Sequence, residues 1–371
     1  MNSVKQELFS AEDRRMMTIA LALARRGVGF TEPNPLVGAV VSRRGRVVGA
    51  GYHRRFGHRH AEVEALSQGR LDGTTLYVTL EPCDHQGKTP PCTDLILERR
   101  IARVVVAAKD PHPLVNGRGI ARLKRAGVEV RVGLLREEAE ELNRHYRTLI
   151  LRGRPYVALH AGLSLEGKMT DRHLASRWMT GPVAREVSHS LRGEFSAVLA
   201  GRGTVLADDP RLTVPGPEWQ GKRLWRVVLD ADNSLPDTLR VFTERRHFPL
   251  MLVSARGTEA RGRRGDAHLF VDRDPEGRLD LEQILLAMGQ SGIASVLVEG
   301  GGAVLDSFLR RRLFDEVDFF YAPKLVGGRE AIEPFATGVA RLDEALRFAR
   351  TEWIALTDGM LLRGYDPCSP V

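Results

Sequence analysis

Four side chains in the first hundred residues have the types and spacing of a metal site with a general acid/base beside it. His60 and Glu62 stand two positions apart, Cys83 follows a proline, and Cys92 comes nine positions later. One imidazole and two thiolates form a ligand set for zinc that leaves the fourth coordination position open for water. A carboxylate that does not bind the metal can accept and return a proton. We therefore predict one zinc ion per chain, held by His60, Cys83 and Cys92, with Glu62 as the catalytic acid/base.

This set of groups suits the hydrolytic removal of an amino group from a nitrogen heterocycle. Zinc lowers the pKa of bound water towards neutrality, so that hydroxide is available to attack a ring carbon. Ammonia can leave once a carboxylate has carried the water proton to it. His-x-Glu followed by Pro-Cys-x-x-Cys is a signature of zinc deaminases that act on nucleobases. This chain departs from it in one respect, because eight residues, 84–91, separate the two cysteines.

Hydrophobic periodicity predicts the elements that position these residues. Residues 75–80 form a β-rich apolar run that ends just before Glu81-Pro82, and a helical pattern follows Cys92, where a helix N-terminus favours a thiolate. The alternation of strands and helices indicates a three-layer α/β domain. We expect helices at 11–26, 60–66, 94–99, 120–126 and 137–151, and strands at 37–42, 46–51, 75–80, 103–108 and 128–132.

The α/β pattern restarts after the turn residues Arg152-Gly-Arg-Pro155. We therefore expect two domains, residues 1–150 and 151–371. Strands are predicted at 156–161, 197–200, 226–229, 250–253 and 295–298, with helices between them. The last of these strands runs into a glycine turn, 300–302, and a helix at 303–310, whose free N–H groups suit a phosphate. The turn does not have the spacing of a dinucleotide-binding fingerprint.

Composition narrows the class of protein. No run approaches the length of a membrane span, the N-terminus lacks an apolar signal core, and only three cysteines are present. We therefore expect a cytoplasmic protein without a disulfide framework and without a membrane partner. The formal net charge is +8, but only 6% of residues are aromatic, which disfavours a stacking surface for nucleic acid. The charge equally suits a phosphorylated small molecule.

The two halves together resemble the bifunctional riboflavin-biosynthesis deaminase–reductase family, the RibD family, over nearly the whole chain. The resemblance is strongest at 33–40, 51–53, 60–62 and 79–92, where the long gap between the cysteines is itself a family trait. It implies a cytidine-deaminase-like three-layer α/β domain followed by a dihydrofolate-reductase-like α/β domain. It also implies zinc-dependent deamination of a phosphoribosylaminopyrimidine, and then reduction of its ribose to a ribityl phosphate with NADPH.

The resemblance further implies roles for individual residues. In the deaminase domain it assigns substrate contacts to Asn34, His53, Lys88 and Asp110. In the reductase domain it assigns substrate contacts to Ser176, Arg192, Leu212 and Glu299. It places NADPH against Leu163, Trp178, Thr204, Asp208, Gly301 and Gly302. It also implies a homo-oligomer, either a dimer or a tetramer.

Three residues depart from the family pattern in the second half. His160 stands where the family has a lysine, Glu166 replaces an aspartate, and Pro215 stands where an arginine is common. We expect all three to lie in or near the reductase pocket, and we expect His160 and Pro215 to slow reduction. Two alternatives stay open at this point. One is a deaminase with a weakened or inactive reductase-like domain, and the other is a deaminase that acts on nucleic-acid bases.

Overall fold

The chain divides into two compact units, residues 1–152 and residues from Gly153 onward, and each is described by itself. The structure is a computed structural model. It describes residues 9–86, 90–171, 173, 179–243, 247–259, 265–328, 331–335, 338 and 341–365.

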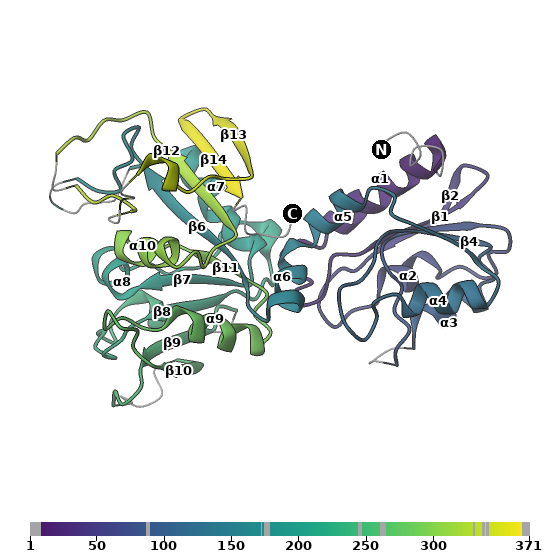
Figure 1. Cartoon of the computed structure of the whole chain (residues 1–371), viewed down its shortest axis with the longest axis horizontal. Coiled ribbons are helices and arrows are strands. Elements are labelled where there is room, and N and C mark those ends of the chain that lie inside the picture. Colours follow the sequence, from purple (N-terminus) through teal and green to yellow (C-terminus); the bar gives the residue numbers. More distant parts are fainter. Residues whose placement is uncertain are drawn as a thin grey trace. The chain divides into compact units, whose positions relative to one another are not determined.

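The first unit is built on a five-stranded sheet with the strand order β2-β1-β3-β4-β5 (Figure 1). β1 pairs antiparallel with β2 and β3, whereas β3, β4 and β5 run parallel. Leu80 at the end of β3 lies opposite Ala108 at the end of β4, so the residues that follow these strands share one edge of the sheet. The strands are β1 (Gly38–Arg43), β2 (Arg46–Tyr52), β3 (Thr75–Leu80), β4 (Arg103–Ala108) and β5 (Glu129–Val132).

Helices cover both faces of this sheet and make the predicted three layers. Met16 and Met17 of α1 pack with Ala139 of α5 on one face, and Ile96 of α3 packs with Leu123 of α4 on the other. Because both faces are covered, β3 and β4 are continuous apolar runs in the sequence. The helices are α1 (Ala11–Arg25), α2 (Ala61–Ala65), α3 (Cys92–Glu98), α4 (Arg118–Arg125), α5 (Arg136–Leu142) and α6 (Arg144–Arg152).

The second unit contains a nine-stranded sheet with the order β10-β9-β8-β7-β11-β6-β12-β14-β13. The strands from β10 to β12 run parallel, and β14 pairs antiparallel with β12 and β13. The strands are β6 (Tyr156–Leu163), β7 (Ala197–Gly201), β8 (Trp225–Leu229), β9 (Leu250–Ala255), β10 (Ala267–Val271), β11 (Ser295–Val298), β12 (Glu316–Tyr321), β13 (Arg350–Leu356) and β14 (Gly359–Tyr365).

Two helices pack on each face of the second sheet. Ile284 of α9 and Phe308 of α10 lie in one apolar cluster, whereas Val205 of α8 and Ala184 of α7 lie in two clusters that use the opposite strand positions. The helices are α7 (Pro182–Leu191), α8 (Arg202–Asp208), α9 (Leu281–Gln290) and α10 (Gly302–Arg310). Short 3₁₀ turns occupy Arg192–Glu194, Pro217–Trp219, Arg240–Phe242 and Leu342–Glu344. Among the described residues, no helix is long and apolar enough to cross a membrane.

The predicted elements differ from the observed ones in two ways. The single helix expected at 137–151 is two helices, because Asn143 leaves the helical conformation and its side chain bonds to Leu36. The strands β10, β12, β13 and β14 were not predicted. β13 is an edge strand whose residues are nearly all exposed, so its sequence carries no buried apolar run.

Candidate metal centre and reductase cavity

The three predicted zinc ligands lie together in the first unit. His60 directly precedes α2, Cys83 lies just beyond the end of β3, and Cys92 is the first residue of α3. The Nδ1 atom of His60 is 3.3 Å from Sγ of Cys92 and 3.7 Å from Sγ of Cys83. Nitrogen and sulfur ligands of one tetrahedral zinc ion stand about 3.5 Å apart, given the usual metal–ligand bond lengths. The donor atoms therefore fit a zinc ion with three protein ligands.

The two cysteine sulfurs differ in electrostatic environment. Hydrogen bonding to Cys92 lowers the pKa of Cys83 to about 4, and the backbone N–H of Cys92 lies 3.4 Å from that sulfur. The same contact with Cys83, together with burial, raises the pKa of Cys92. Without a metal ion the pair therefore favours the thiolate at Cys83, and both sulfurs would be thiolates as zinc ligands. Two thiolates this close require a cation between them, which is what a zinc ion provides.

Glu62 is buried in α2 next to this cluster, with 4% of its surface exposed. Burial raises the pKa of its carboxyl to about 7, and the charge on Cys83 acts in the same direction. A carboxyl group that can both hold and release a proton near neutral pH suits general acid/base catalysis. The position of Glu62 agrees with the predicted role.

A hydrogen-bonded bridge joins the segments that carry the two cysteines. The Oγ1 atom of Thr93 donates to Oδ1 of Asp84 at 2.7 Å, and Arg122 of α4 donates to the same oxygen at 2.7 Å. Asp84 directly follows Cys83, and Thr93 directly follows Cys92. The bridge therefore fixes the spacing of the two sulfurs across the long loop between them. Sequence reasoning did not identify it.

Two of the residues that the resemblance assigns to the deaminase substrate are in contact. The Nδ2 atom of Asn34 lies 3.2 Å from Nε2 of His53, whose Nδ1 atom lies 2.9 Å from the carbonyl oxygen of Arg59. That carbonyl can only accept, so His53 carries its proton on Nδ1 and accepts from Asn34 through Nε2. The rings of His53 and His60 are 5.9 Å apart, which places the pair beside the metal ligands.

Asp110 approaches the same region from the end of β4, the strand next to β3. Its Oδ1 atom accepts a hydrogen bond from the backbone N–H of His112 at 2.8 Å and from the hydroxyl of Tyr146 at 2.9 Å. Burial raises the pKa of its carboxyl, although these donors oppose the shift. Lys88, the fourth predicted contact, lies outside the described residues.

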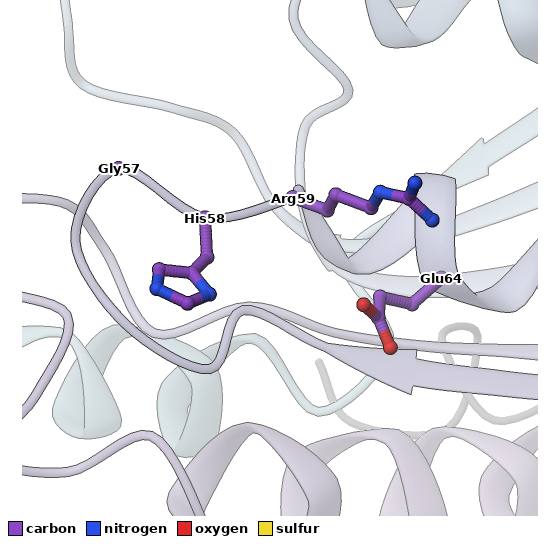
Figure 2. A pocket seen from close by; sticks show the side chains of 4 residues that line it. All are labelled: Gly57, His58, Arg59 and Glu64. Atoms are coloured by element: carbon purple, nitrogen blue, oxygen red, sulfur yellow. The ribbon is translucent and has the colours of Figure 1, made fainter.

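A surface hollow of about 410 Å³ lies beside the loop 54–59. Gly57, His58 and Arg59 of the loop and Glu64 of α2 line it. Figure 2 shows that the side chains of His58 and Glu64 lie on the same side of the loop, whereas Arg59 extends away over α2. The hollow contains none of the predicted ligands or substrate contacts, so we assign no chemistry to it.

The second unit contains a cavity of about 770 Å³. Its walls include residues that follow β7 and β11, neighbouring parallel strands whose carboxyl ends form the usual binding edge of such a sheet. Four predicted cofactor residues and one predicted substrate residue line it, namely Thr204, Asp208, Gly301, Gly302 and Glu299. The predicted residues Leu163, Arg192 and Leu212 do not contribute to the described walls. Ser176 and Trp178 lie outside the described residues.

Three arginines that sequence reasoning missed also line this cavity, namely Arg202, Arg273 and Arg278. Arg202 is the first residue of α8, directly after β7, and it stands between two glycines, which was a usable signal for an anion site. Arg273 and Arg278 follow β10, at the far end of the sheet order, and nothing in their local sequence marks them.

Arg192 and Glu299 form a partly buried bidentate ion pair. The Nε and Nη2 atoms of Arg192 donate to the two carboxylate oxygens of Glu299 at 2.6 and 2.7 Å, and Nη1 donates to the carbonyl of Thr213 at 2.8 Å. Burial alone would raise the pKa of Glu299, but the guanidinium outweighs burial and lowers it. All three nitrogens of Arg192 are thus engaged within the protein, and Glu299 is the member of the pair that reaches the cavity.

Of the three departures from the family pattern, only His160 lines the cavity. Glu166 is exposed and accepts hydrogen bonds from the backbone of Val326 and Gly327, and Pro215 is exposed. The expectation was that all three lie in or near the pocket; His160 is part of its walls, and the expectation stays a prediction for Glu166 and Pro215. Burial lowers the pKa of His160 to about 4, so this side chain is neutral at physiological pH. Its Nε2 atom lies 2.6 Å from Oγ of Ser188.

We predict that His160 destabilises the second unit as the pH falls. In the unfolded chain, a histidine side chain takes up a proton below about pH 6.5. In the folded chain, the side chain of His160 stays neutral until the pH falls to about 4. The unfolded state then binds more protons, so the free energy of unfolding decreases over this window. Between these pH values, the unfolding temperature of the wild type should fall further than the unfolding temperature of the His160→Gln variant. Parallel curves for the two proteins would contradict the assignment.

Comparison with known proteins identifies the family of each half of the chain. Residues 10–108 match the family model of the cytidine and deoxycytidylate deaminase zinc-binding region, and residues 155–362, more than half of the chain, match the RibD C-terminal domain. The riboflavin biosynthesis protein RibD of Bacillus amyloliquefaciens is 44% identical over 84% of this chain and 85% of its own length. RibD of Escherichia coli K12 is 38% identical over 91% of this chain and 95% of its own length.

Solved structures agree as well. A diaminohydroxyphosphoribosylaminopyrimidine deaminase/5-amino-6-(5-phosphoribosylamino)uracil reductase from Thermotoga maritima aligns over 96% of this chain and 99% of its own, with 35% identity and a TM-score of 0.84. RibD of Acinetobacter baumannii aligns over the same shares with 34% identity and a TM-score of 0.86. A zinc-binding deaminase region, a reductase domain and relatives of matching length lead to one conclusion: the chain belongs to the RibD family of bifunctional riboflavin-biosynthesis deaminase–reductases.

Proposed function

We propose that the first unit hydrolyses the 2-amino group of 2,5-diamino-6-(5-phosphoribosylamino)pyrimidin-4-one. The observation that carries this proposal is the cluster of His60, Cys83 and Cys92, whose ligand atoms all lie within 4.8 Å of one another, with buried Glu62 beside it. The Thermotoga maritima relative, which aligns over nearly the whole chain, is named for this deamination.

In the proposed reaction the chain holds the pyrimidine and moves one proton. Zinc bound by the three ligands would make hydroxide available at neutral pH. Glu62 takes the proton of the attacking water and passes it to the departing amine, so that the C–N bond breaks and ammonia leaves while the ring carbon keeps the oxygen. Asn34, His53 and Asp110 present polar atoms beside the metal ligands, where they hold the edge of the pyrimidine.

We propose that the second unit reduces the ribose of the deaminated product with NADPH. The backbone at the start of α10 fits a phosphate group, because no side chain of the described residues caps α10 and the first N–H groups of a helix have no partner within the helix. A Cβ atom at Gly302 would come within 2.5 Å of the carbonyl oxygen of Glu333, so only glycine fits this close turn. Arg202 and Arg278 add positive charge to the same cavity.

NADPH would supply the hydride, and the chain would hold the cofactor and the phosphoribose. Thr204, Asp208, Gly301 and Gly302 are the described residues that we assign to the cofactor. Glu299 faces the cavity as an anion held by Arg192, and it can accept hydrogen bonds from ribose hydroxyls. His160 contributes a neutral imidazole instead of a permanent cation, so we expect slower reduction than in a typical relative.

The test is ammonia release together with binding of NADPH by the full-length chain. We expect ammonia from the pyrimidine ribotide without NADPH, and a change in NADPH fluorescence on titration with the protein. Single-turnover oxidation of NADPH with the deaminated substrate then gives the rate of reduction. An absence of NADPH binding would reduce the function to deamination alone, and fast turnover would show that the neutral His160 does not limit the reaction.

Assembly and location belong to the same proposal. We propose a homo-oligomer, a dimer or a tetramer, in the cytoplasm, and light scattering of the purified chain would measure its size.

A further inference from the structure

Helix α6, the last helix of the first unit, contacts the deaminase pocket at three points. Asn143 directly precedes the helix, and His145 and Tyr146 lie in its first turn. None of these residues belongs to the zinc motif or to the predicted substrate contacts. Each of them nevertheless hydrogen-bonds to a loop that carries one of those contacts.

Two of these residues fix the loop of Asn34, one on each side of Asn34. The side chain of Asn143 accepts the N–H of Leu36 at 2.7 Å and donates to the carbonyl of Leu36 at 3.0 Å. On the other side of Asn34, Nδ1 of His145 lies 2.6 Å from a carboxylate oxygen of Glu32. The loop is thus held two residues before and two residues after Asn34.

The third residue, Tyr146, fixes Asp110. The hydroxyl of Tyr146 donates to Oδ1 of Asp110 at 2.9 Å, and the backbone N–H of His112 donates to the same oxygen at 2.8 Å. Two donors on one carboxylate oxygen set the rotation of the carboxylate as well as its position. Both Tyr146 and Asp110 are buried, so water cannot readily replace the lost partner.

We infer that α6 is the positioning element of the deaminase pocket, with Tyr146 orienting Asp110 and with Asn143 and His145 holding the loop that carries Asn34. This inference rests on the proposed deaminase function. It also accounts for the break between α5 and α6. An uninterrupted helix would keep Asn143 in the helical conformation. The observed turn instead lets the side-chain amide of Asn143 bond to both the N–H and the carbonyl of Leu36.

The chain offers a matched pair of variants to test the role of Tyr146. Tyr77 is also buried, and its hydroxyl donates to Oδ1 of Asp13 at 2.8 Å in a contact with α1. Tyr146→Phe and Tyr77→Phe therefore each remove one hydroxyl from one buried aspartate. If Tyr146 has only a structural role, the two variants will behave alike.

We expect Tyr146→Phe to raise the KM of deamination about tenfold, the usual worth of one hydrogen bond to a charged group. Its kcat should change less, and its zinc content and NADPH binding should match the wild type. Tyr77→Phe should lower thermal stability and leave KM unchanged. His145→Gln, at a partly exposed position, should also raise KM and carries less risk of misfolding.

The outcomes separate this inference from the function on which it rests. If the wild type releases no ammonia from the pyrimidine ribotide, the proposed deaminase function is wrong. The inference about α6 is wrong if the wild type is active but the two α6 variants have the same KM as the control. The α6 variants are Tyr146→Phe and His145→Gln, and the control is Tyr77→Phe. A fall in zinc content in Tyr146→Phe would also overturn it, since the helix would then support the metal centre instead of the substrate contacts.

Discussion

Replacing Glu62 with glutamine should abolish measurable deamination and leave zinc in place. Glutamine keeps the size of the side chain but cannot take up and release the proton that the reaction moves. Loss of a general acid/base typically slows a reaction about 10²- to 10⁴-fold. Ammonia release would measure the rate, and metal analysis of the same preparation would show that zinc is retained.

Glu64 provides the control for this variant. It lies two residues further along α2, its carboxylate pairs with Arg54 at 3.3 Å, and it faces a surface hollow instead of the metal ligands. Glu64→Gln should therefore deaminate at the rate of the wild type. Near-normal ammonia release from Glu62→Gln would show that another residue moves the proton.

Replacing Cys83 with serine should remove most of the zinc and, with it, the deaminase activity. Cys83 is the sulfur whose pKa is lowered, to about 4, and it lies 3.7 Å from the ligand nitrogen of His60. A serine hydroxyl is a poor replacement for a thiolate ligand. Metal analysis after dialysis should show marked loss of zinc.

Cys368→Ser, which changes the third cysteine of the chain, should keep its zinc. Binding of NADPH should persist in Cys83→Ser, because the reductase cavity belongs to the other compact unit. Full zinc occupancy in Cys83→Ser would contradict the ligand assignment.

The metal centre could be predicted from sequence because its chemistry is encoded locally. His60, Glu62 and Cys83 take their places from a helix start and a strand end that the hydrophobic pattern also indicates. The residues that support the centre have no such signal. Asp84 and Thr93 are ordinary polar residues in sequence, and only the folded chain brings them to 2.7 Å of each other.

Tertiary contacts explain the rest of what the sequence did not show. The helix pattern runs from Glu137 to Leu151, and the interruption at Asn143 comes from a bond to Leu36, which is 107 positions away. The arginines that follow β10 reach the reductase cavity because of the order of strands in the sheet, which periodicity cannot reveal. In the same way, the resemblance assigned Arg192 and Glu299 to the substrate separately, and only the fold shows that they form an ion pair with each other.

The most direct test of the two-step function is a coupled assay of the full-length chain with the diaminopyrimidine ribotide, in which both products are identified by mass spectrometry. Without NADPH, we expect ammonia and the deaminated ribotide to accumulate. With NADPH, we expect that intermediate to be converted to the ribityl phosphate, with one NADPH oxidised for each molecule reduced. Failure to form the deaminated ribotide, or formation of that ribotide with no reduction when NADPH is present, would contradict the bifunctional account.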